Sequence, residues 1–171
     1  LPPGYKIAAN IPYYLTSNLL RVLTEAPNHF DKAALLVQKE VAERACAGPR
    51  EMSLLAVSVQ FYAEPSLGQV VPASLFTPPP KVDSQILKLS YRRAPLFPGI
   101  DTPKFFPLVK AGFSAKRKKL RSSLCGGLNI DKSTAEKLLE TAGIDPNLRA
   151  QALSLENWYK LYLVADTQAL G

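Results

Sequence analysis

The sequence predicts an α/β fold: the second half of a doubly wound sheet that ends in a hairpin, followed by a small all-helical domain. Residues 5–92 alternate short apolar runs with stretches of helical periodicity. Residues 93–103, RAPLFPGIDTP, form a linker rich in Pro and Gly. After this linker every apolar pattern has helical spacing. We therefore expect the chain to divide near residue 95, into domains at 1–94 and 95–171.

The first domain is expected to open with a buried strand, YKIAA at 5–9, that ends in an Asn-Ile-Pro-Tyr loop. Thr16 or Ser17 can cap the helix that follows, because the apolar positions after them have helical spacing. The continuous apolar run AALLV at 33–37 is typical of a parallel strand that is covered on both faces. These elements give the start of a strand-helix-strand unit.

The rest of the first domain is expected to finish the sheet. A short helix over about 39–47 closes at Gly48-Pro49. Residues 53–63 fit either a helix or a strand, and we favour the helix. The segment LGQVVPASLF indicates a strand that is interrupted at Pro72. Residues 82–92 alternate apolar and polar side chains, which predicts an antiparallel strand with one wetter face.

Four helices are expected in the second domain, because each apolar stretch there is bounded by a helix start or stop signal. They are expected at 103–113; at 115–125, between Ser114 and Gly126-Gly127; from Asp131 or Ser133 to Gly143; and from Ser154 onward.

Composition indicates a globular chain of 171 residues, with 47% hydrophobic and 20% charged residues. No apolar stretch is long enough to span a membrane, and no signal segment opens the chain, so we expect a cytoplasmic protein. Cys46 and Cys125 are too few for a disulfide framework, and with His29 as the single histidine we expect no metal site.

The net charge of +7 is concentrated in one part of the chain. Residues 96–125 hold seven Lys and Arg but one acidic residue, whereas residues 126–171 hold four basic and six acidic residues. A local excess of this kind indicates a polyanionic partner, with nucleic acid the first choice. A solvated helix face is the alternative.

The loop Asn10-Ile11-Pro12-Tyr13 can act on the exocyclic amine of adenine. That amine is a poor nucleophile because its lone pair is delocalised into the ring. The Asn10 side-chain oxygen and the Ile11 carbonyl, held by the rigid Pro12, could accept both N–H hydrogens and localise the lone pair. Tyr13 offers a flat face for an extruded base, worth about 1–3 kcal/mol. The alternative is an ordinary turn, since Asn and Pro are turn formers. The position of the loop at the carboxyl end of a strand favours a binding site.

The segment SLFTPPPKVDS, residues 74–84, could supply the other wall of the same site. Its three prolines would hold Phe76 at a fixed height, so that a base could be sandwiched between Tyr13 and Phe76. Lys81 could reach a phosphate or remain solvated. The alternative is a Pro-rich connector in which Phe76 anchors the core.

The segment FSAKRKKLRSSL, residues 113–124, is basic around most of a predicted helix. Its cations are Lys116, Arg117, Lys118, Lys119 and Arg121. Only Leu120 and Leu124 remain for packing, so we expect this helix to lie beside a phosphate backbone.

Taken in order, these stretches resemble the ribosomal RNA small-subunit adenine N6,N6-dimethyltransferases. The motifs that carry the resemblance are ANIPYYLTS, LVQKEVAERACAGP, PASLFTPPPKVDSQILKL, FSAKRKKLRSSL and AGIDPNLRAQALSLENW. It implies a Rossmann-like methyltransferase sheet and transfer of two methyl groups from S-adenosylmethionine to each of two adjacent adenosines. These lie in a hairpin near the 3′ end of small-subunit rRNA, so a role in ribosome biogenesis is implied.

The resemblance also implies roles for single residues. Asn10 lies at the junction of cofactor and adenine, Tyr13 and Phe76 sandwich the base, and the basic segment belongs to a helical rRNA-binding domain. The expected partner is small-subunit rRNA or an immature small subunit, and the intact enzyme is expected to be a monomer.

One departure from the family is large, because the glycine-rich loop and the acidic residue that hold S-adenosylmethionine are absent from this sequence. We therefore expect a fragment that exposes a strand edge and apolar surface, binds the cofactor weakly or not at all, and is inactive alone. The alternatives are a DNA adenine methyltransferase, a large-subunit rRNA adenine methyltransferase, and a non-catalytic rRNA-binding assembly module.

Overall fold

The structure is a computed structural model that describes residues 2–168. It forms two compact units, which we call the sheet unit (Leu1–Ala47 and Leu55–Leu96) and the helical unit (Gly48–Leu54 and Phe97–Gly171). The predicted α/β class is confirmed, with a four-stranded sheet and seven α-helices within the described residues. None of the helices in the described part of the chain is long and apolar enough to cross a membrane.

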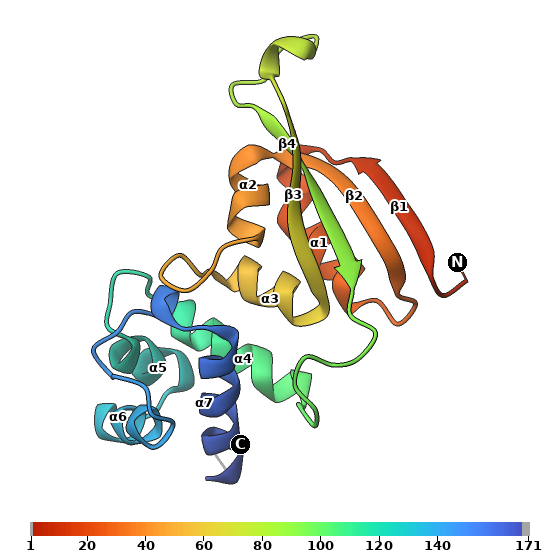
Figure 1. Ribbon diagram of the computed structural model, residues 1–171. Helices are drawn as coiled ribbons and strands as arrows, with labels where there is room; N and C mark the ends of the chain where they lie inside the picture. The colour runs from red at the N-terminus through yellow and green to blue at the C-terminus, as the bar shows by residue number, and fades with distance from the viewer. Residues whose placement is uncertain (1, 169–171) are drawn as a thin grey trace. The chain divides into compact units, whose positions relative to one another are not determined.

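The sheet unit follows the predicted order of strands and helices (Figure 1). Its elements are β1 (Tyr5–Asn10), η1 (Tyr13–Leu15), α1 (Thr16–Glu25), β2 (Phe30–Gln38), α2 (Lys39–Ala45), α3 (Leu54–Tyr62), β3 (Ala63–Val71), η2 (Ala73–Leu75) and β4 (Ser84–Tyr91). The strands lie in the order β1-β2-β4-β3. β1 and β2 are parallel, and β4 is antiparallel to both β2 and β3. The preference for a helix over 53–63 is therefore confirmed, and the strand predicted around LGQVV begins earlier, at Ala63.

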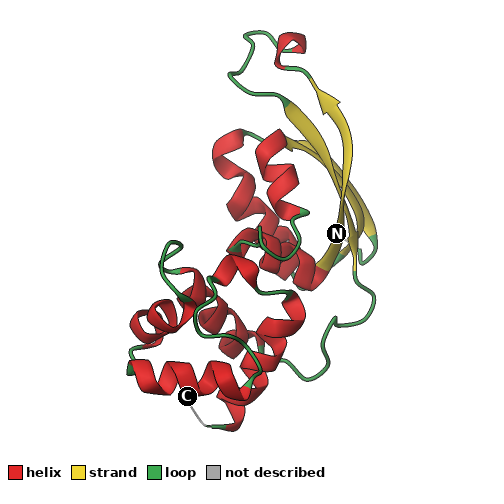
Figure 2. Ribbon diagram, turned by 60° about the vertical axis from the view of Figure 1, so that its left-hand side comes forward, coloured by secondary structure: helices red, strands yellow, loops and turns green. Residues whose placement is uncertain are grey.

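The core of the sheet unit lies on one face of the sheet, where α1, α2 and α3 pack (Figure 2). Ala33, Leu35 and Val37 of β2 point into this core and are at most 5% exposed. Ala34 and Leu36 alternate with them and lie on the opposite face, where Ala34 is exposed. The expectation that β2 is covered on both faces is wrong for this structure, because the three α-helices of the sheet unit all lie on one side of the sheet.

The open face of the sheet carries lysines and small residues. One row across it joins Ala8, Ala34, Lys88 and Ser66 on the four strands. A shallow hollow of about 510 Å³ lies over this part of the sheet. β1 pairs with β2 alone among the described residues, so its other edge is unpaired and the predicted exposed edge is confirmed. β1 itself is half-buried or exposed, which corrects the expectation of a buried strand.

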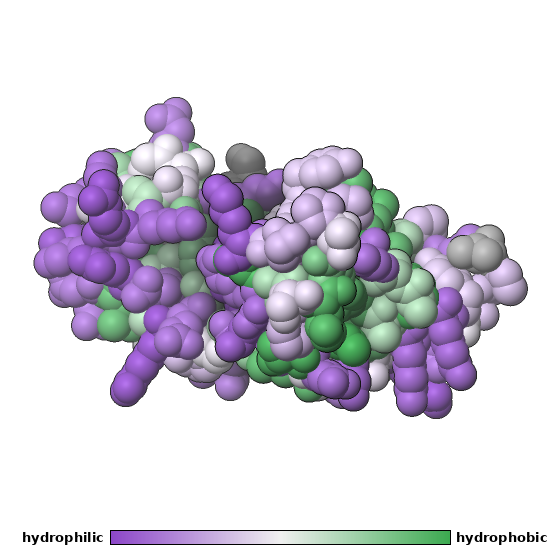
Figure 3. Space-filling model, turned by 90° about the horizontal axis from the view of Figure 1, so that it is seen from above, coloured by the Kyte–Doolittle hydropathy of each residue, from purple (hydrophilic) through white to green (hydrophobic). Residues whose placement is uncertain are grey.

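Large apolar side chains are also exposed on β3 and on its connection to β4. They are Leu67, Val70, Leu75 and Val82. Figure 3, coloured by residue hydropathy, shows hydrophobic residues exposed on the face it presents. Uncovered apolar surface was predicted beside β1, whereas these residues lie on β3, at the opposite edge of the sheet, and on its connection to β4.

The helical unit contains four α-helices around Trp158, which is fully buried. Its elements are α4 (Thr102–Phe113), α5 (Leu120–Leu128), α6 (Lys132–Thr141), η3 (Ala150–Ala152) and α7 (Leu155–Thr167). Gly112 of α4 faces the Trp158 ring so closely that a Cβ there would clash with it. Ser154 caps α7 through a capping box with Asn157, and the Asp131 carboxylate caps α6 by accepting from the Thr134 N–H at 2.6 Å, which confirms two predicted helix starts.

Two predicted helix boundaries are wrong in the helical unit. α5 begins at Leu120, because Lys119 is extended, and the residues from Ser114 to Lys118 form turns. The helix continues through Gly126 and Gly127 and ends at Leu128, with Asn129 as the C-cap residue in the left-handed conformation at φ 54°. Gly127 is needed inside the helix, because a Cβ there would lie 2.6 Å from the Ala111 Cα of α4.

One predicted cap in the sheet unit is also wrong. α1 begins at Thr16, earlier than a cap at Thr16 or Ser17 would place it; its N-cap residue is Leu15, and no side chain caps the helix. The Thr16 hydroxyl instead donates backward to the carbonyls of Pro12 and Tyr13, at 3.4 and 3.3 Å. This ties the start of α1 to the loop that precedes it.

Candidate active site

The first wall of the candidate site is the loop that leaves the carboxyl end of β1. Asn10 is the last residue of the strand, and its side chain is exposed. Ile11 is 2% exposed, and its N–H donates to the Leu36 carbonyl of β2 at 3.2 Å. Pro12 then turns the chain into the single turn η1, which carries Tyr13. A buried anchor at Ile11 therefore holds the polar side chain before it and the aromatic ring after it.

The carbonyl oxygens of this loop differ in whether they accept hydrogen bonds from the protein. The Pro12 carbonyl accepts from the Leu15 N–H at 3.0 Å and from the Thr16 hydroxyl, which also reaches the Tyr13 carbonyl. No such bond to the Ile11 carbonyl is made by any of residues 2–168. Two acceptors next to each other, the Asn10 side-chain oxygen and the Ile11 carbonyl, can therefore receive hydrogens from a ligand.

The second wall comes from the connection between β3 and β4. The turn η2 ends at Phe76, which is extended at φ −106° and ψ 151° and half-buried. The Thr77–Pro78 peptide bond is cis. The chain then returns through Pro80 to Ser84, the first residue of β4, which is 1% exposed.

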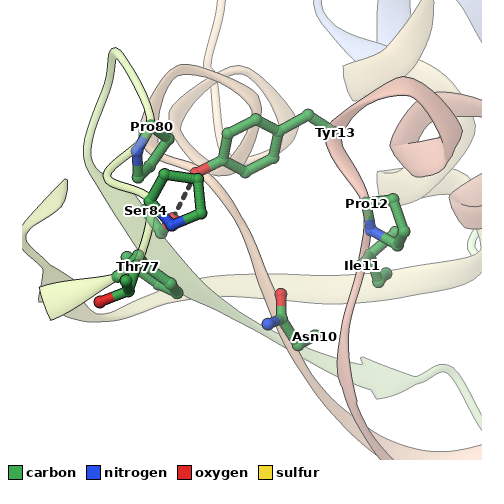
Figure 4. A pocket seen from close by; sticks show the side chains of 9 residues that line it. Asn10, Ile11, Pro12, Tyr13, Thr77, Pro80 and Ser84 are labelled. Atoms are coloured by element: carbon green, nitrogen blue, oxygen red, sulfur yellow. Dashed lines mark hydrogen bonds between the residues drawn. The ribbon is translucent and has the colours of Figure 1, made fainter.

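The two walls line one open pocket of about 270 Å³ (Figure 4). Its lining comes from two segments that lie more than 60 residues apart in the sequence: Asn10, Ile11, Pro12, Tyr13, Phe76, Thr77, Pro78, Pro80 and Ser84. The five residues predicted to act in catalysis therefore lie around the same pocket. Figure 4 shows the Asn10 amide at one side of it and the Tyr13 ring reaching across toward Ser84.

A hydrogen bond joins the two walls. The Tyr13 hydroxyl lies 2.7 Å from the Ser84 Oγ, and either oxygen can be the donor. This length is typical of a good O–H···O bond. Because Ser84 is fixed in the sheet by its pairing with Gln38 and Val71, the bond fixes the far end of the Tyr13 ring.

The shape and chemistry of the pocket suit a flat heteroaromatic ring that carries an amino group. Tyr13, Phe76 and the prolines supply flat apolar surface, on which a nucleobase can stack. Asn10 and the Ile11 carbonyl supply acceptors at one side. The described residues contain no group of three or more His, Cys, Asp or Glu that could hold a metal ion.

The structure places the predicted RNA-binding cations in three different settings. Lys81 is exposed on the loop next to Pro80, which lines the pocket. The four consecutive cations at 116–119 are exposed in the turns between α4 and α5, and so do not surround a helix as expected. Arg121 lies on α5 and is paired with Glu136 of α6 at 2.8 Å, and both side chains are partly buried.

Titratable groups with clearly shifted pKa values lie outside the pocket. Burial, with the nearby Glu25 carboxylate and Tyr91, raises the pKa of Tyr62 to about 12. Burial also raises the pKa of the Cys46 thiol, which disfavours the reactive thiolate. These residues therefore do not offer a second nucleophile.

The prediction missed four lining residues, of which Ser84 is the most informative. The others are Thr77, Pro78 and Pro80. All four belong to the SLFTPPPKVDS segment, of which the prediction named only Phe76 for the base-binding site and Lys81 for RNA binding. Nothing in the sequence pairs Ser84 with Tyr13, because 71 residues separate them.

Comparisons with known proteins give a consistent result. The family model described as ribosomal RNA adenine dimethylase matches residues 3–167. The curated ribosomal RNA small subunit methyltransferase A of Dehalococcoides mccartyi is 45% identical over 160 residues, which are 94% of this chain and 55% of that protein. The protein of the same name from Lactococcus lactis is 40% identical over 159 residues, which are 91% of this chain and 54% of its own length. The chain thus spans about half the length of these relatives.

Two solved structures share the fold. A dimethyladenosine transferase from Plasmodium falciparum superposes with a TM-score of 0.81 at 26% identity, over 98% of this chain and 69% of that one. The 23S rRNA methyltransferase ErmE gives a TM-score of 0.71 at 27% identity, over 97% of this chain and 67% of that one. The Rossmann-like character of the sheet unit is thereby confirmed.

Proposed function

The chain belongs to the ribosomal RNA adenine dimethylase family, and from this premise we propose that it carries the adenine-binding side of an rRNA adenine-N6 methyltransferase. The substrate we propose is a pair of adjacent adenosines in a hairpin near the 3′ end of small-subunit rRNA, each dimethylated at N6. The observation that carries the proposal is the single pocket in which the Asn10-to-Tyr13 loop meets Phe76.

The family uses S-adenosylmethionine, which supplies an electrophilic methyl group when bound. The described residues fit only one side of such a cofactor. Asn10 presents an amide at the carboxyl end of β1, where α/β sheets bind ligands. No described strand ends in a glycine-rich loop that could cradle the rest of the molecule. We therefore derive only what the residues of this chain do to the base.

The base is extruded from the RNA and stacks on Tyr13, with Phe76 as the opposite wall. The Asn10 side-chain oxygen and the Ile11 carbonyl accept the two N6 hydrogens. Both acceptors draw the nitrogen toward tetrahedral geometry, so that its lone pair becomes available for attack. After one transfer a single N–H remains, and the methylamine must rotate before the second. A pocket walled by two separate loops leaves room for this rotation.

Binding of the RNA backbone is assigned to the exposed cations at 116–119 and to Lys81. Four consecutive cations in a turn can follow a phosphate backbone more freely than cations fixed on a helix. We propose that the helical unit positions the rRNA or immature small subunit while the sheet unit holds the base. The protein is then cytoplasmic, takes part in ribosome biogenesis and acts as a monomer.

A second candidate is methylation of large-subunit rRNA, which the likeness to the 23S rRNA methyltransferase ErmE favours. The curated relatives at 40–45% identity carry the small-subunit name, so we prefer the first candidate. Methylation of isolated small and large ribosomal subunits by the intact enzyme separates the two, because each candidate predicts a different labelled particle.

The test of the proposed role is Asn10→Ala in the intact enzyme. Removal of an oriented polar stabiliser typically lowers the rate of the chemical step by about 10²-fold or more, and we expect this loss in single-turnover methylation of small-subunit rRNA. Asn18→Ala is the matched control, because Asn18 is exposed on α1. Near-normal turnover of Asn10→Ala would rule out the role of the Asn10 side-chain oxygen in activating the N6 amine, although the chain would still belong to the family.

A further inference from the structure

Asp83 and Ser84 are consecutive residues, and between them they bond to both walls of the pocket. We infer that this pair acts as positioning residues that set the gap between Tyr13 and Phe76. The inference rests on the proposed function and deepens it, because it says what holds the two base-stacking rings at the right separation.

Ser84 controls the Tyr13 wall. Its Oγ lies 2.7 Å from the Tyr13 hydroxyl, and the serine is 1% exposed, so water does not compete freely for the bond. η1 is a single turn and holds only the near end of the ring. Without Ser84 the ring would be free to tilt about its side-chain torsions. With it, the ring has one orientation before any base arrives.

Asp83 controls the Phe76 wall. Its carboxylate accepts from the N–H of Ala73, the first residue of η2, at 2.9 Å. The Ala73 carbonyl in turn accepts from the Phe76 N–H at 3.2 Å. The main-chain carbonyl of Asp83 accepts from the Lys39 N–H at 3.0 Å, where α2 begins. Asp83 therefore connects the loop that carries Phe76 to the body of the sheet unit.

The physical need for such a pair follows from how the pocket is built. Its walls belong to two connections that are far apart in the sequence, and each could move without the other. A base gains stacking energy from both rings only if their separation matches its thickness. Asp83 and Ser84 are neighbours at the start of β4, so they hold both walls against the same part of the sheet. The gap between Tyr13 and Phe76 is then formed before a base binds, and the two side chains lose less conformational entropy on binding.

The spectroscopic test labels the tyrosines of the intact protein with 3-fluorotyrosine and assigns the Tyr13 signal by its loss in Tyr13→Phe. We expect Ser84→Ala to shift this ¹⁹F signal and Ser84→Thr, which keeps a hydroxyl, to restore it. Ser90→Ala, at an exposed serine of the same strand, is the matched control and should leave the signal unchanged. An unmoved Tyr13 signal in Ser84→Ala would overturn the role of Ser84.

The kinetic test is a double-substitution cycle on rRNA methylation. Ser84→Ala and Tyr13→Phe each delete the same bond, so each should lower kcat/KM by about five- to tenfold, and the double variant should be no worse than either. Losses that multiply would show that the two residues act separately. Asp83→Ala should lower kcat/KM similarly, whereas Asp83→Asn, which keeps an acceptor oxygen, should recover most of it. Equal losses for the two Asp83 variants would overturn the role of the Asp83 acceptor.

The two tests separate this inference from the proposed function. If the wild-type enzyme methylates no adenosine, the proposed function fails, and the ¹⁹F signal alone decides whether Ser84 orients Tyr13. If methylation is normal in Ser84→Ala and Asp83→Ala, the proposed function stands and the positioning role is wrong.

Discussion

Substituting Ala for Gly at two consecutive residues of α5 should change stability in opposite directions. At Gly127 a Cβ would lie 2.6 Å from both the Cα and the Cβ of Ala111, whereas at Gly126 nothing lies within 4 Å. Carbon atoms in contact are ordinarily about 3.5–4.0 Å apart, so Gly127→Ala requires α5 to move from α4 by about 1 Å. The atoms met belong to the backbone and to a short side chain, so no flexible group can move aside.

The size of the effect follows from two opposing contributions. Replacing Gly by Ala inside a helix stabilises it by up to about 1 kcal/mol, and this gain is common to both variants. Overpacking typically costs about 1–3 kcal/mol, and only Gly127→Ala incurs it. We therefore expect Gly126→Ala to stabilise the helical unit and to be about 1–3 kcal/mol more stable than Gly127→Ala. For a unit of this size, where 1 kcal/mol shifts Tm by about 4–8 °C, that difference corresponds to roughly 4–24 °C in Tm.

The assay is thermal unfolding followed by tryptophan fluorescence. Trp158 is the single tryptophan and is fully buried in the helical unit, so its signal reports on the unit that both glycines occupy. The reasoning would be refuted if Gly127→Ala melted at or above the temperature of Gly126→Ala, because the close approach of α4 and α5 would then be absent in solution.

Three further predictions concern charged groups. Replacing Lys118 and Lys119 by Ala should lower rRNA affinity and flatten its salt dependence, with the slope of log K against log salt falling by about 0.7–0.9 for each lost phosphate contact; an unchanged slope would mean that these cations do not touch phosphate. Arg121→Ala should lower the free energy of unfolding by about 1 kcal/mol and change RNA affinity less than the lysine substitutions do, because Arg121 is paired with Glu136; a larger loss of RNA affinity would contradict this. The Asp131 carboxylate accepts a backbone N–H at the start of α6, which holds its pKa below its ordinary value. Its contribution to stability is therefore present above the ordinary carboxyl pKa and is lost as the pH falls through the lowered one. Asp131→Asn should remove this acid dependence in pH-dependent unfolding, and an unchanged profile would rule it out.

The sequence was informative where local chemistry decides the structure. The alternation in 82–92 predicted β4 with Leu87 and Leu89 buried, and both are at most 1% exposed. Ser154 and Asp131 were found as helix caps because their side chains act on residues three positions away. The meeting of the Asn10 loop with Phe76 was predicted from the chemistry of the two segments, and the family resemblance implied it as well; the pocket brings them together.

The sequence was misleading where contacts between residues far apart in the sequence decide the local structure. The run FSAKRKKLRSSL reads as a helix because most of its residues are good helix formers. In the structure the Leu120 N–H donates to the Leu148 carbonyl at 2.7 Å, and Leu120 is fully buried, so the chain must turn before it. On a continuous helix, Lys116 would face Lys119 and Arg117 would face Arg121, and each of these like-charged pairs disfavours the helix. Gly127 was read as a helix stop, but its missing side chain serves the contact with α4.

The composition of the helical unit has a consequence for any attempt to separate it. Because this unit takes in Gly48–Leu54 as well as Phe97–Gly171, the polypeptide passes between the units at three places. Met52, from the short inserted stretch, is 5% exposed, and its N–H donates to the Gln151 carbonyl at 3.1 Å. A protease that cuts once between residues 93 and 103 should therefore leave two polypeptides that still co-migrate under native conditions. A gene that starts at residue 95 would express the four helices without the segment Gly48–Leu54, and so without the buried Met52 side chain and the backbone hydrogen bond from Met52 to Gln151.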